Sequence, residues 1–204
     1  MSEVNVTDVS GLSFSNSNLQ WYALLEGAHP TFNTPGLIYS HIELPESVAL
    51  YQNSPYEALS DVSPILVKID QPHDWLHHWQ GAFPSLDGLM LSSKDHLEVV
   101  AAHLQTLVSV RVEGGADAIF RFHDSWVASS LYPTLDESEK TRLHGVVRQW
   151  LWVCGRQAFT AERADEAAQD EPPLSDGWLQ LSKASQLAIS NGMLSKRNWK
   201  ESQQ

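Results

Sequence analysis

The chain has 204 residues, of which 42% are hydrophobic and 19% are charged. This length and composition are typical of a globular protein with one domain, or one domain and a small appendage, and they exclude general disorder. The formal net charge of -12 repels phosphate backbones and anionic lipid surfaces, so we expect no nucleic-acid partner and no membrane partner.

The sequence shows no targeting signal. No stretch approaches the roughly 18 consecutive apolar residues that cross a membrane, and residues 1–10 lack the basic and apolar blocks of a signal peptide. We therefore expect a cytoplasmic protein. Its single cysteine, Cys154, cannot form an internal disulfide and follows an apolar run, which predicts burial as a small apolar side chain.

The first half of the chain alternates between strand and helix patterns. Residues 1–18 have no sustained period and predict a flexible arm. Trp21 to Leu25 is an apolar run typical of a central strand, which Glu26 and Gly27 end. Residues 28–36 predict a loop or a brief turn of helix. The next elements are expected, in chain order, as a weak element at 48–51, a strand at 63–69, a helix at 74–83 and a strand at 88–91.

Hairpin patterns dominate the second half. Ser93 predicts the N-cap of a helix over 94–108. The elements expected after it are a hairpin at 108–112 and 118–122, helices at 125–131 and 136–143, and strands at 146–153 and 158–160. A helix through Trp150 fits the last pattern as well.

Residues 161–204 suggest a linker and an extension. Residues 161–173 are acidic and alanine-rich, contain a Pro-Pro pair and have no large apolar side chain, so we interpret them as a linker. Residues 174–204 predict a helical extension capped by Ser182. Together with residues 19–160, these patterns predict an α/β (α+β) domain with a mixed β-sheet and flanking helices, followed by the small C-terminal extension.

Histidines offer the clearest candidate for chemistry. His73 and His77 lie four residues apart, which would place both on one helix face as in zinc sites, but no Glu stands in the position of a His-Glu-x-x-His motif. His123 and Asp124 could be half of a catalytic triad, yet no Gly-x-Ser-x-Gly elbow supplies a nucleophile. A metal-dependent hydrolase that uses these three histidines is an open alternative.

The acidic residues at the strand ends are more simply interpreted as caps. Asp124 stands where a strand turns into a helix, and a carboxylate there accepts hydrogen bonds from the first backbone N–H groups. It can also pair with Arg121 or Arg111. Glu26 has the same position after the first strand. No cofactor is predicted from these residues.

Eight tryptophans are unusual for this length, and aromatic side chains dominate both cores and interaction surfaces. Those in apolar motifs are expected in the core: Trp21, Trp126, Trp150 and Trp152. Those beside polar residues are expected to be half-exposed and available to a partner: Trp75, Trp79, Trp178 and Trp199.

Three motifs in order resemble a known family. They are Trp21-Tyr22-Ala23-Leu24-Leu25-Glu26-Gly27-Ala28, then Ser63-Pro64-Ile65-Leu66-Val67, then Arg121-Phe122-His123-Asp124-Ser125-Trp126-Val127. Their order and spacing are similar to the Tap or Tec adaptor chaperones of bacterial type VI secretion, over roughly residues 20–152. Glu26, His123 and Ser125 stand where that family commonly has Asp, Tyr and Pro.

The resemblance implies a protein without enzymatic activity, which binds a cognate secreted effector and loads it onto the VgrG spike or its PAAR tip. It implies structural roles for the motif residues Trp21, Tyr22, Glu26, Gly27, Arg121, Asp124 and Trp126. Contacts with the partners are assigned to Trp75, Trp79, Trp178, Leu181, Leu187 and Trp199.

Partner choice in such adaptors is assigned to the variable C-terminal part. Deletion of residues 174–204 is therefore expected to abolish effector capture and to leave a folded domain. An immunity protein that neutralises a toxin is a further alternative.

Overall fold

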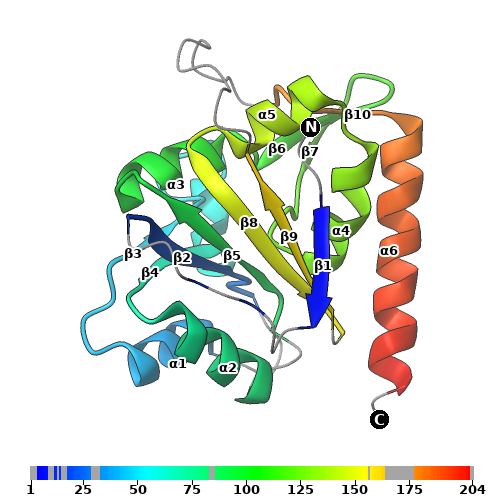
Figure 1. The fold of residues 1–204 in the computed structure, drawn as a ribbon. Helices are drawn as coiled ribbons and strands as arrows, with labels where there is room; N and C mark the ends of the chain where they lie inside the picture. The colour runs from blue at the N-terminus through cyan, green and yellow to red at the C-terminus, as the bar shows by residue number, and fades with distance from the viewer. Residues whose placement is uncertain are drawn as a thin grey trace.

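The computed structural model describes residues 4–8, 12, 14, 18–28, 33–82, 86–155, 157–163 and 177–202. They form a mixed α/β fold, as expected, with helices packed on two sheets (Figure 1). The strands are β1 (Val4–Asp8), β2 (Gln20–Leu25), β3 (Ser47–Ala49), β4 (Ile65–Ile69), β5 (Gly88–Ser93), β6 (Ser109–Val112), β7 (Asp117–Ile119), β8 (Val147–Cys154), β9 (Gln157–Glu162) and β10 (Gln180–Leu181). The helices are α1 (Thr34–His41), α2 (Pro72–Ala82), α3 (Leu97–Gln105), α4 (Ser125–Leu131), α5 (Glu137–His144) and α6 (Lys183–Ser202), with short 3-10 helices η2 (Glu57–Val62) and η3 (Tyr132–Thr134).

The larger sheet has seven strands in the order β1-β9-β8-β5-β2-β4-β3, and the smaller has the order β10-β6-β7. All pairings described in the larger sheet are antiparallel. In the smaller sheet β10 pairs with β6 in parallel and β7 pairs with β6 antiparallel.

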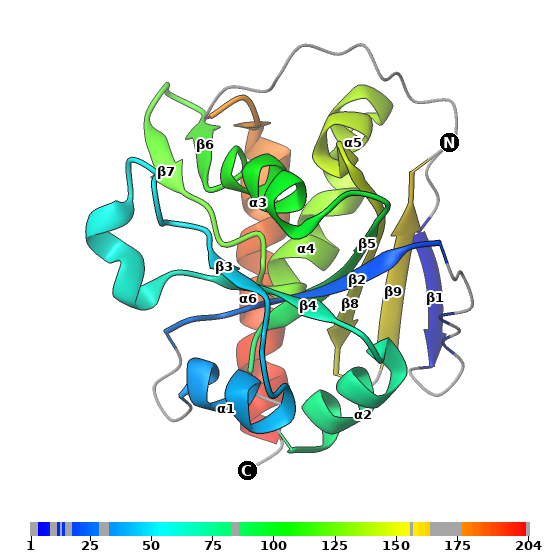
Figure 2. The same cartoon turned by 90° about the vertical axis from the view of Figure 1, so that its left-hand side faces the viewer.

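Strand β2 lies inside the larger sheet, between β5 and β4, and its two faces enter two separate cores. Because side chains alternate along a strand, Tyr22 and Leu24 pack in one apolar cluster, whereas Trp21, Ala23 and Leu25 pack in the other. Helices α3, α4 and α5 cover the first cluster, and α1 and α2 cover the second (Figure 2). Burial on both faces explains why this segment is a continuous apolar run.

The N-terminal segment is better ordered than the sequence predicted. Strand β1 pairs with β9 from Val4 opposite Ala161 to Asp8 opposite Gln157, at the edge of the larger sheet. Phe14 lies edge-on to Trp21, with 4.9 Å between ring centroids. The prediction of a flexible arm is therefore wrong for these residues. Strand β1 depends on its pairing with β9. Its own five residues are too short a pattern to predict an edge strand.

Both predicted hairpins are present, and the strand interpretation of the segment through Trp150 is confirmed. β8 pairs with β9 from Gln149 opposite Glu162 to Cys154 opposite Gln157. The pairing of β6 with β7 confirms the other hairpin, although it lies in the smaller sheet.

Two predictions about helices were wrong in detail. Helix α3 begins at Leu97 rather than at residue 94, and its N-cap is His96. Ser93 is instead the last residue of β5, and its hydroxyl donates to the carbonyl of Val146 at 2.7 Å. Helix α1 occupies part of the predicted loop and is capped by Asn33, whose side chain accepts from the Gly36 N–H at 3.1 Å.

The C-terminal segment joins the main fold. Most of the predicted linker lies outside the described residues, but Ala161 and Glu162 belong to β9. Leu179 and Leu181 are buried in the same cluster as Tyr22. The Ser182 hydroxyl accepts from the Ser185 N–H at 3.1 Å, so the predicted cap is confirmed. Helix α6 then packs along α4 (Figure 1). None of the described helices has the length and apolarity needed to cross a membrane.

Candidate functional site

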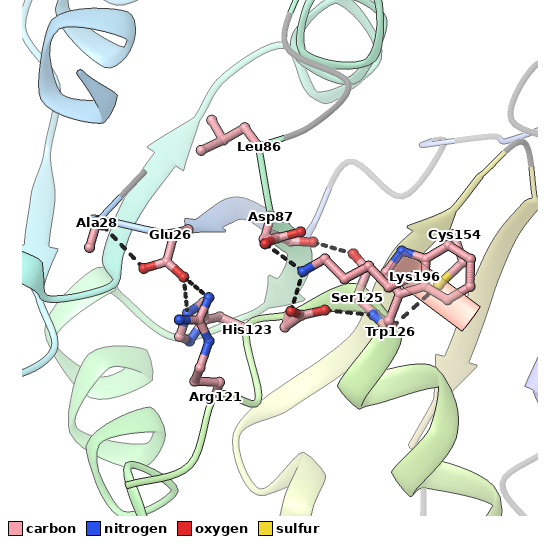
Figure 3. A network of polar contacts seen from close by, with 12 residues as sticks. Glu26, Ala28, Leu86, Asp87, Arg121, His123, Ser125, Trp126, Cys154 and Lys196 are labelled. Carbon is pink, nitrogen blue, oxygen red and sulfur yellow. Dashed lines mark hydrogen bonds and ion pairs between the residues drawn. The ribbon is translucent and has the colours of Figure 1, made fainter. Parts of the chain in front are cut away.

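Glu26, at the end of β2, is the centre of a buried polar cluster (Figure 3). Only 4% of the residue is exposed, and its carboxylate accepts hydrogen bonds from Arg121, from His123 Nε2 at 3.2 Å and from the Ala28 N–H at 3.1 Å. Burial raises the pKa of Glu26, but the hydrogen bond and charge of His123 and the charge of Arg121 outweigh it and lower that pKa to about 2. Glu26 is therefore a permanently ionised structural acid at neutral pH.

A second cluster begins one residue after His123. Asp124 is fully buried and caps α4 by accepting from the Trp126 N–H at 3.0 Å. Its other oxygen accepts from Lys196 Nζ, which also donates to Asp87 at 2.6 Å (Figure 3). One lysine of α6 thus binds two carboxylates from the main domain.

The order of the chain explains how these groups meet. Asp87 directly precedes β5, and Glu26 directly follows β2. Because these two strands are antiparallel neighbours, with Leu25 opposite Gly88, both acids lie beyond the same end of the strand pair. The predicted cap role of Asp124 is confirmed, and Arg121 pairs with Glu26. Arg111 instead pairs with Asp117 at 3.2 Å.

Gly27 stands where the chain leaves β2 and passes close to another segment. A Cβ atom at this position would lie 1.8 Å from the backbone oxygen of Ser63. Only glycine allows this approach. Glu26 therefore supplies a buried charge and Gly27 allows a tight backbone contact, which explains why these two residue types follow β2 in the first motif.

Two side chains near this site could serve as nucleophiles, Ser125 and Cys154, and each makes a hydrogen bond inside the fold. The Ser125 hydroxyl donates to the Gly88 carbonyl at 2.6 Å. The Cys154 thiol contacts the Ser125 carbonyl at 3.4 Å, and burial raises its pKa to about 12. The predicted burial of Cys154 is confirmed, and its thiolate is strongly disfavoured at neutral pH.

The histidines do not form one group. His73 and His77 are exposed on α2, whereas His123 is buried beside Glu26. His78 of α2 stacks on His41 of α1, with 4.3 Å between ring centroids. Within the described residues, no three His, Cys, Asp or Glu side chains converge on a point where they could hold a metal ion.

Two tryptophans assigned to partner binding are in the core instead. Trp75 is 2% exposed and Trp79 is 3% exposed, because α2 turns them toward the larger sheet. Trp79 Nε1 donates to the Leu86 carbonyl at 3.1 Å. The prediction of half-exposed side chains is wrong for both. The prediction relied on the polar residues next to them in the sequence, but those residues occupy the opposite face of an amphipathic helix.

The other residues assigned to partners have mixed positions. Trp178 is half-buried beneath Arg142, and Trp199 is half-buried beside Trp126. Leu181 is only 6% exposed and belongs to the core, whereas Leu187 is 64% exposed. Trp126, expected in the core, is half-buried. Trp21, Trp150 and Trp152 are buried as predicted.

Sequence reasoning missed Asp87, Lys196 and the exposed Leu194. The sequence-based predictions gave Lys196 no role. A weak signal was present, since Ser185 and Gly192 are small, lie on the same side of the helix as Lys196 and mark the face that contacts α4.

A scan of family models matched residues 21–142 to DUF4123, described as a domain of unknown function. No curated protein and no solved structure gave a match. The matched range includes Glu26, Asp87, Arg121, His123 and Asp124, while Lys196 lies beyond it. The match covers more than half of the chain, which therefore belongs to the DUF4123 family, a family associated with effector adaptors of type VI secretion.

Proposed function

We propose that this protein is an adaptor chaperone, which binds a cognate type VI effector in the cytoplasm and loads it onto a VgrG or PAAR spike protein. The observation that carries the proposal is the DUF4123 match across residues 21–142. The role requires binding surfaces and no reaction.

The chemistry of the candidate site supports a binding role. Its acids and bases are bonded to one another inside the fold, where they position β2, β5, α4 and α6. Such a network stabilises a rigid scaffold. Solvent-exposed apolar side chains, among them Leu187, are available for contact with another polypeptide.

The negative charge of the chain suits a chaperone that keeps aggregation-prone proteins in solution. A net charge of -12 keeps a protein soluble and opposes self-association. An effector whose apolar segment is covered by such a protein would remain soluble until transfer. Release of the effector from this chain then requires that the spike protein bind the same apolar segment, or a surface whose occupation weakens the complex.

The experiment is co-expression of the tagged chain with the effector and spike proteins encoded beside it, followed by pull-down and measurement of soluble effector. We expect a stable complex and an effector that is soluble only with this chain. An unrelated effector is the control. Failure to recover either component would overturn the proposal.

Two readouts of the same preparation separate the alternatives. Stoichiometric zinc or iron that is lost in His77→Ala would favour a metal-dependent hydrolase. Neutralised toxicity without delivery of the effector would favour an immunity protein.

A further inference from the structure

The connection between β3 and β4 is long for two strands that pair with each other. Antiparallel neighbours are usually joined by about two to five residues, whereas residues 50–64 lie between these two strands and contain η2. We call residues 50–64 the η2 loop. Compact surface loops whose two ends lie close together frequently carry a function.

The base of the η2 loop is buried and fixed. The Leu50 N–H donates to the Pro64 carbonyl at 2.9 Å. The Tyr51 N–H donates to the Ser63 hydroxyl, also at 2.9 Å, and both of these residues are buried. The Ser63 carbonyl lies so close to Gly27 that a Cβ atom there would be 1.8 Å from its oxygen. The glycine of the first sequence motif therefore packs against the base of this loop.

The outer part of the loop is ordered but buries none of its side chains. No residue of η2 is buried, and its first turn is held by the Leu59 N–H, which donates to the Tyr56 carbonyl at 2.8 Å. Leu59 is 41% exposed and Val62 is 43% exposed. In Figure 2 the cyan segment that contains η2 stands at the left edge of the molecule, with no described element outside it. Ordering this backbone costs entropy that its apolar side chains do not offset by burial, a pattern typical of a binding surface.

The charges beside these two apolar side chains are negative and uncompensated. The η2 loop contains Glu57 and Asp61 and has no Lys, Arg or His. Both acids are exposed, and neither forms an ion pair with another residue in the described part of the chain. By contrast, Glu46, which precedes β3, binds Lys68 of β4 at 2.6 Å. The outer face of the loop therefore combines exposed apolar area with two free carboxylates.

We propose that the outer face of the η2 loop, defined by Glu57, Leu59, Asp61 and Val62, docks a segment of the effector in which basic residues flank an apolar side chain. The inference rests on the proposed function and names the surface and the chemistry of the segment that it takes. Contact with Leu59 and Val62 supplies apolar burial, and the two carboxylates select Lys or Arg on the partner. The same charges disfavour a second copy of this chain, whose net charge is -12.

The first test replaces the exposed apolar side chains without touching the core. The double variant Leu59→Gln with Val62→Gln is compared with Leu44→Gln with Val99→Gln. The control residues are 87% and 45% exposed and lie outside the loop, before β3 and in α3. We expect effector affinity to fall about tenfold or more in the first variant and to stay unchanged in the control, with equal melting temperatures. Unchanged affinity in the first variant, or an equal loss in both, would overturn the inference and leave the proposed function intact.

The second test removes the charges. Glu57→Gln with Asp61→Asn changes the net charge by the same amount as Glu43→Gln with Asp70→Asn, at two exposed acids outside the loop. We expect about three-fold or greater weakening of effector binding at low salt for the first variant alone. The difference should shrink at high salt, because salt screens exposed charges. The same loss in both variants would assign the effect to the net charge of the chain and refute docking at the loop.

The third test identifies the occupant. A photo-crosslinking amino acid is placed at Ala58, which is exposed in η2, and the complex with the co-expressed effector is irradiated. We expect a cross-link to an effector segment with Lys or Arg beside an apolar residue. A cross-link to an acidic segment, to the spike protein or to a second copy of this chain would overturn the inference, as would no cross-link in a complex that still forms. If the wild-type chain binds no effector at all, the proposed function fails and the inference fails with it.

Discussion

Lys196 of the C-terminal helix donates a hydrogen bond to Asp124, the residue that caps α4. The side chain of Asp124 is fully buried and that of Lys196 is 8% exposed, so the pair is shielded from water. Lys196 also bonds Asp87, which directly precedes β5. The last helix of the chain is therefore fixed to the main fold by buried charges.

Replacing Lys196 should strongly destabilise the protein. Lys196→Met keeps much of the side-chain volume but leaves Asp87 and Asp124 without their cation. Breaking a buried ion pair by removal of one partner costs about 3–5 kcal/mol. Urea unfolding at neutral pH measures this loss, and Lys94→Met, at an exposed loop position, is the control. A loss below that of the control would show that the buried pair is not important for stability.

Glu26 should make the protein sensitive to acid. Its pKa in the folded protein is lowered from the ordinary 4.5 to about 2. A lowered pKa contributes stability that is complete above pH about 5 and is lost as the pH falls toward 2.

Glu26→Gln removes this contribution. We expect it to reduce the free energy of unfolding by about 2 kcal/mol at pH 7, a figure reduced from the full shift because Arg121 is half-exposed. The difference between variant and wild type should shrink as the pH falls from about 5 to about 2. Urea unfolding across this range is the measurement. A difference that stays constant with pH would contradict the role of the buried charge.

Two glycine substitutions should have opposite effects. A Cβ atom at Gly192 would lie 1.9 Å from Ser130 Oγ and 2.9 Å from the Trp126 carbonyl oxygen, so Gly192→Ala pushes α6 away from α4. At Gly81, in α2, nothing lies within 4 Å of the added atom.

Alanine otherwise favours a helix over glycine by about 1 kcal/mol. We therefore expect Gly81→Ala to raise the melting temperature and Gly192→Ala to lower it. Hydrogen exchange in α6 should increase only in the second variant. Stabilisation by both substitutions would mean that the two helices are not in close contact.

Truncation after residue 176 should damage the fold rather than remove only a partner surface. It deletes β10, α6 and the buried Leu179 and Leu181, and it leaves Asp124 without Lys196. The expectation of a folded domain without its C-terminal part is therefore replaced by one of poor solubility or a lowered melting temperature. A cooperative unfolding transition with unchanged midpoint would contradict this, and it would restore truncation as a test of partner binding.

Local patterns predicted most of the elements because their causes are local. Trp21 to Leu25 is apolar at every position, and the structure buries it on both faces of the sheet. Asp124 precedes a helix and caps it, and Ser182 does the same for α6. Glycine, capping residues and hydrophobic periodicity act within a few residues, so a single sequence is enough to recognise them.

The tertiary structure decided which side of each helix meets the core and which charges meet each other. Trp75 and Trp79 look exposed beside their polar neighbours, but the sheet lies on their side of α2. Lys196 reaches Asp87 and Asp124 across 109 and 72 residues of chain. Pairings over such distances depend on how strands and helices stack, which no local pattern contains. The sequence by itself therefore determined most of the elements and the family resemblance, while packing alone placed the buried charges and left Leu187 and Leu194 of α6 exposed.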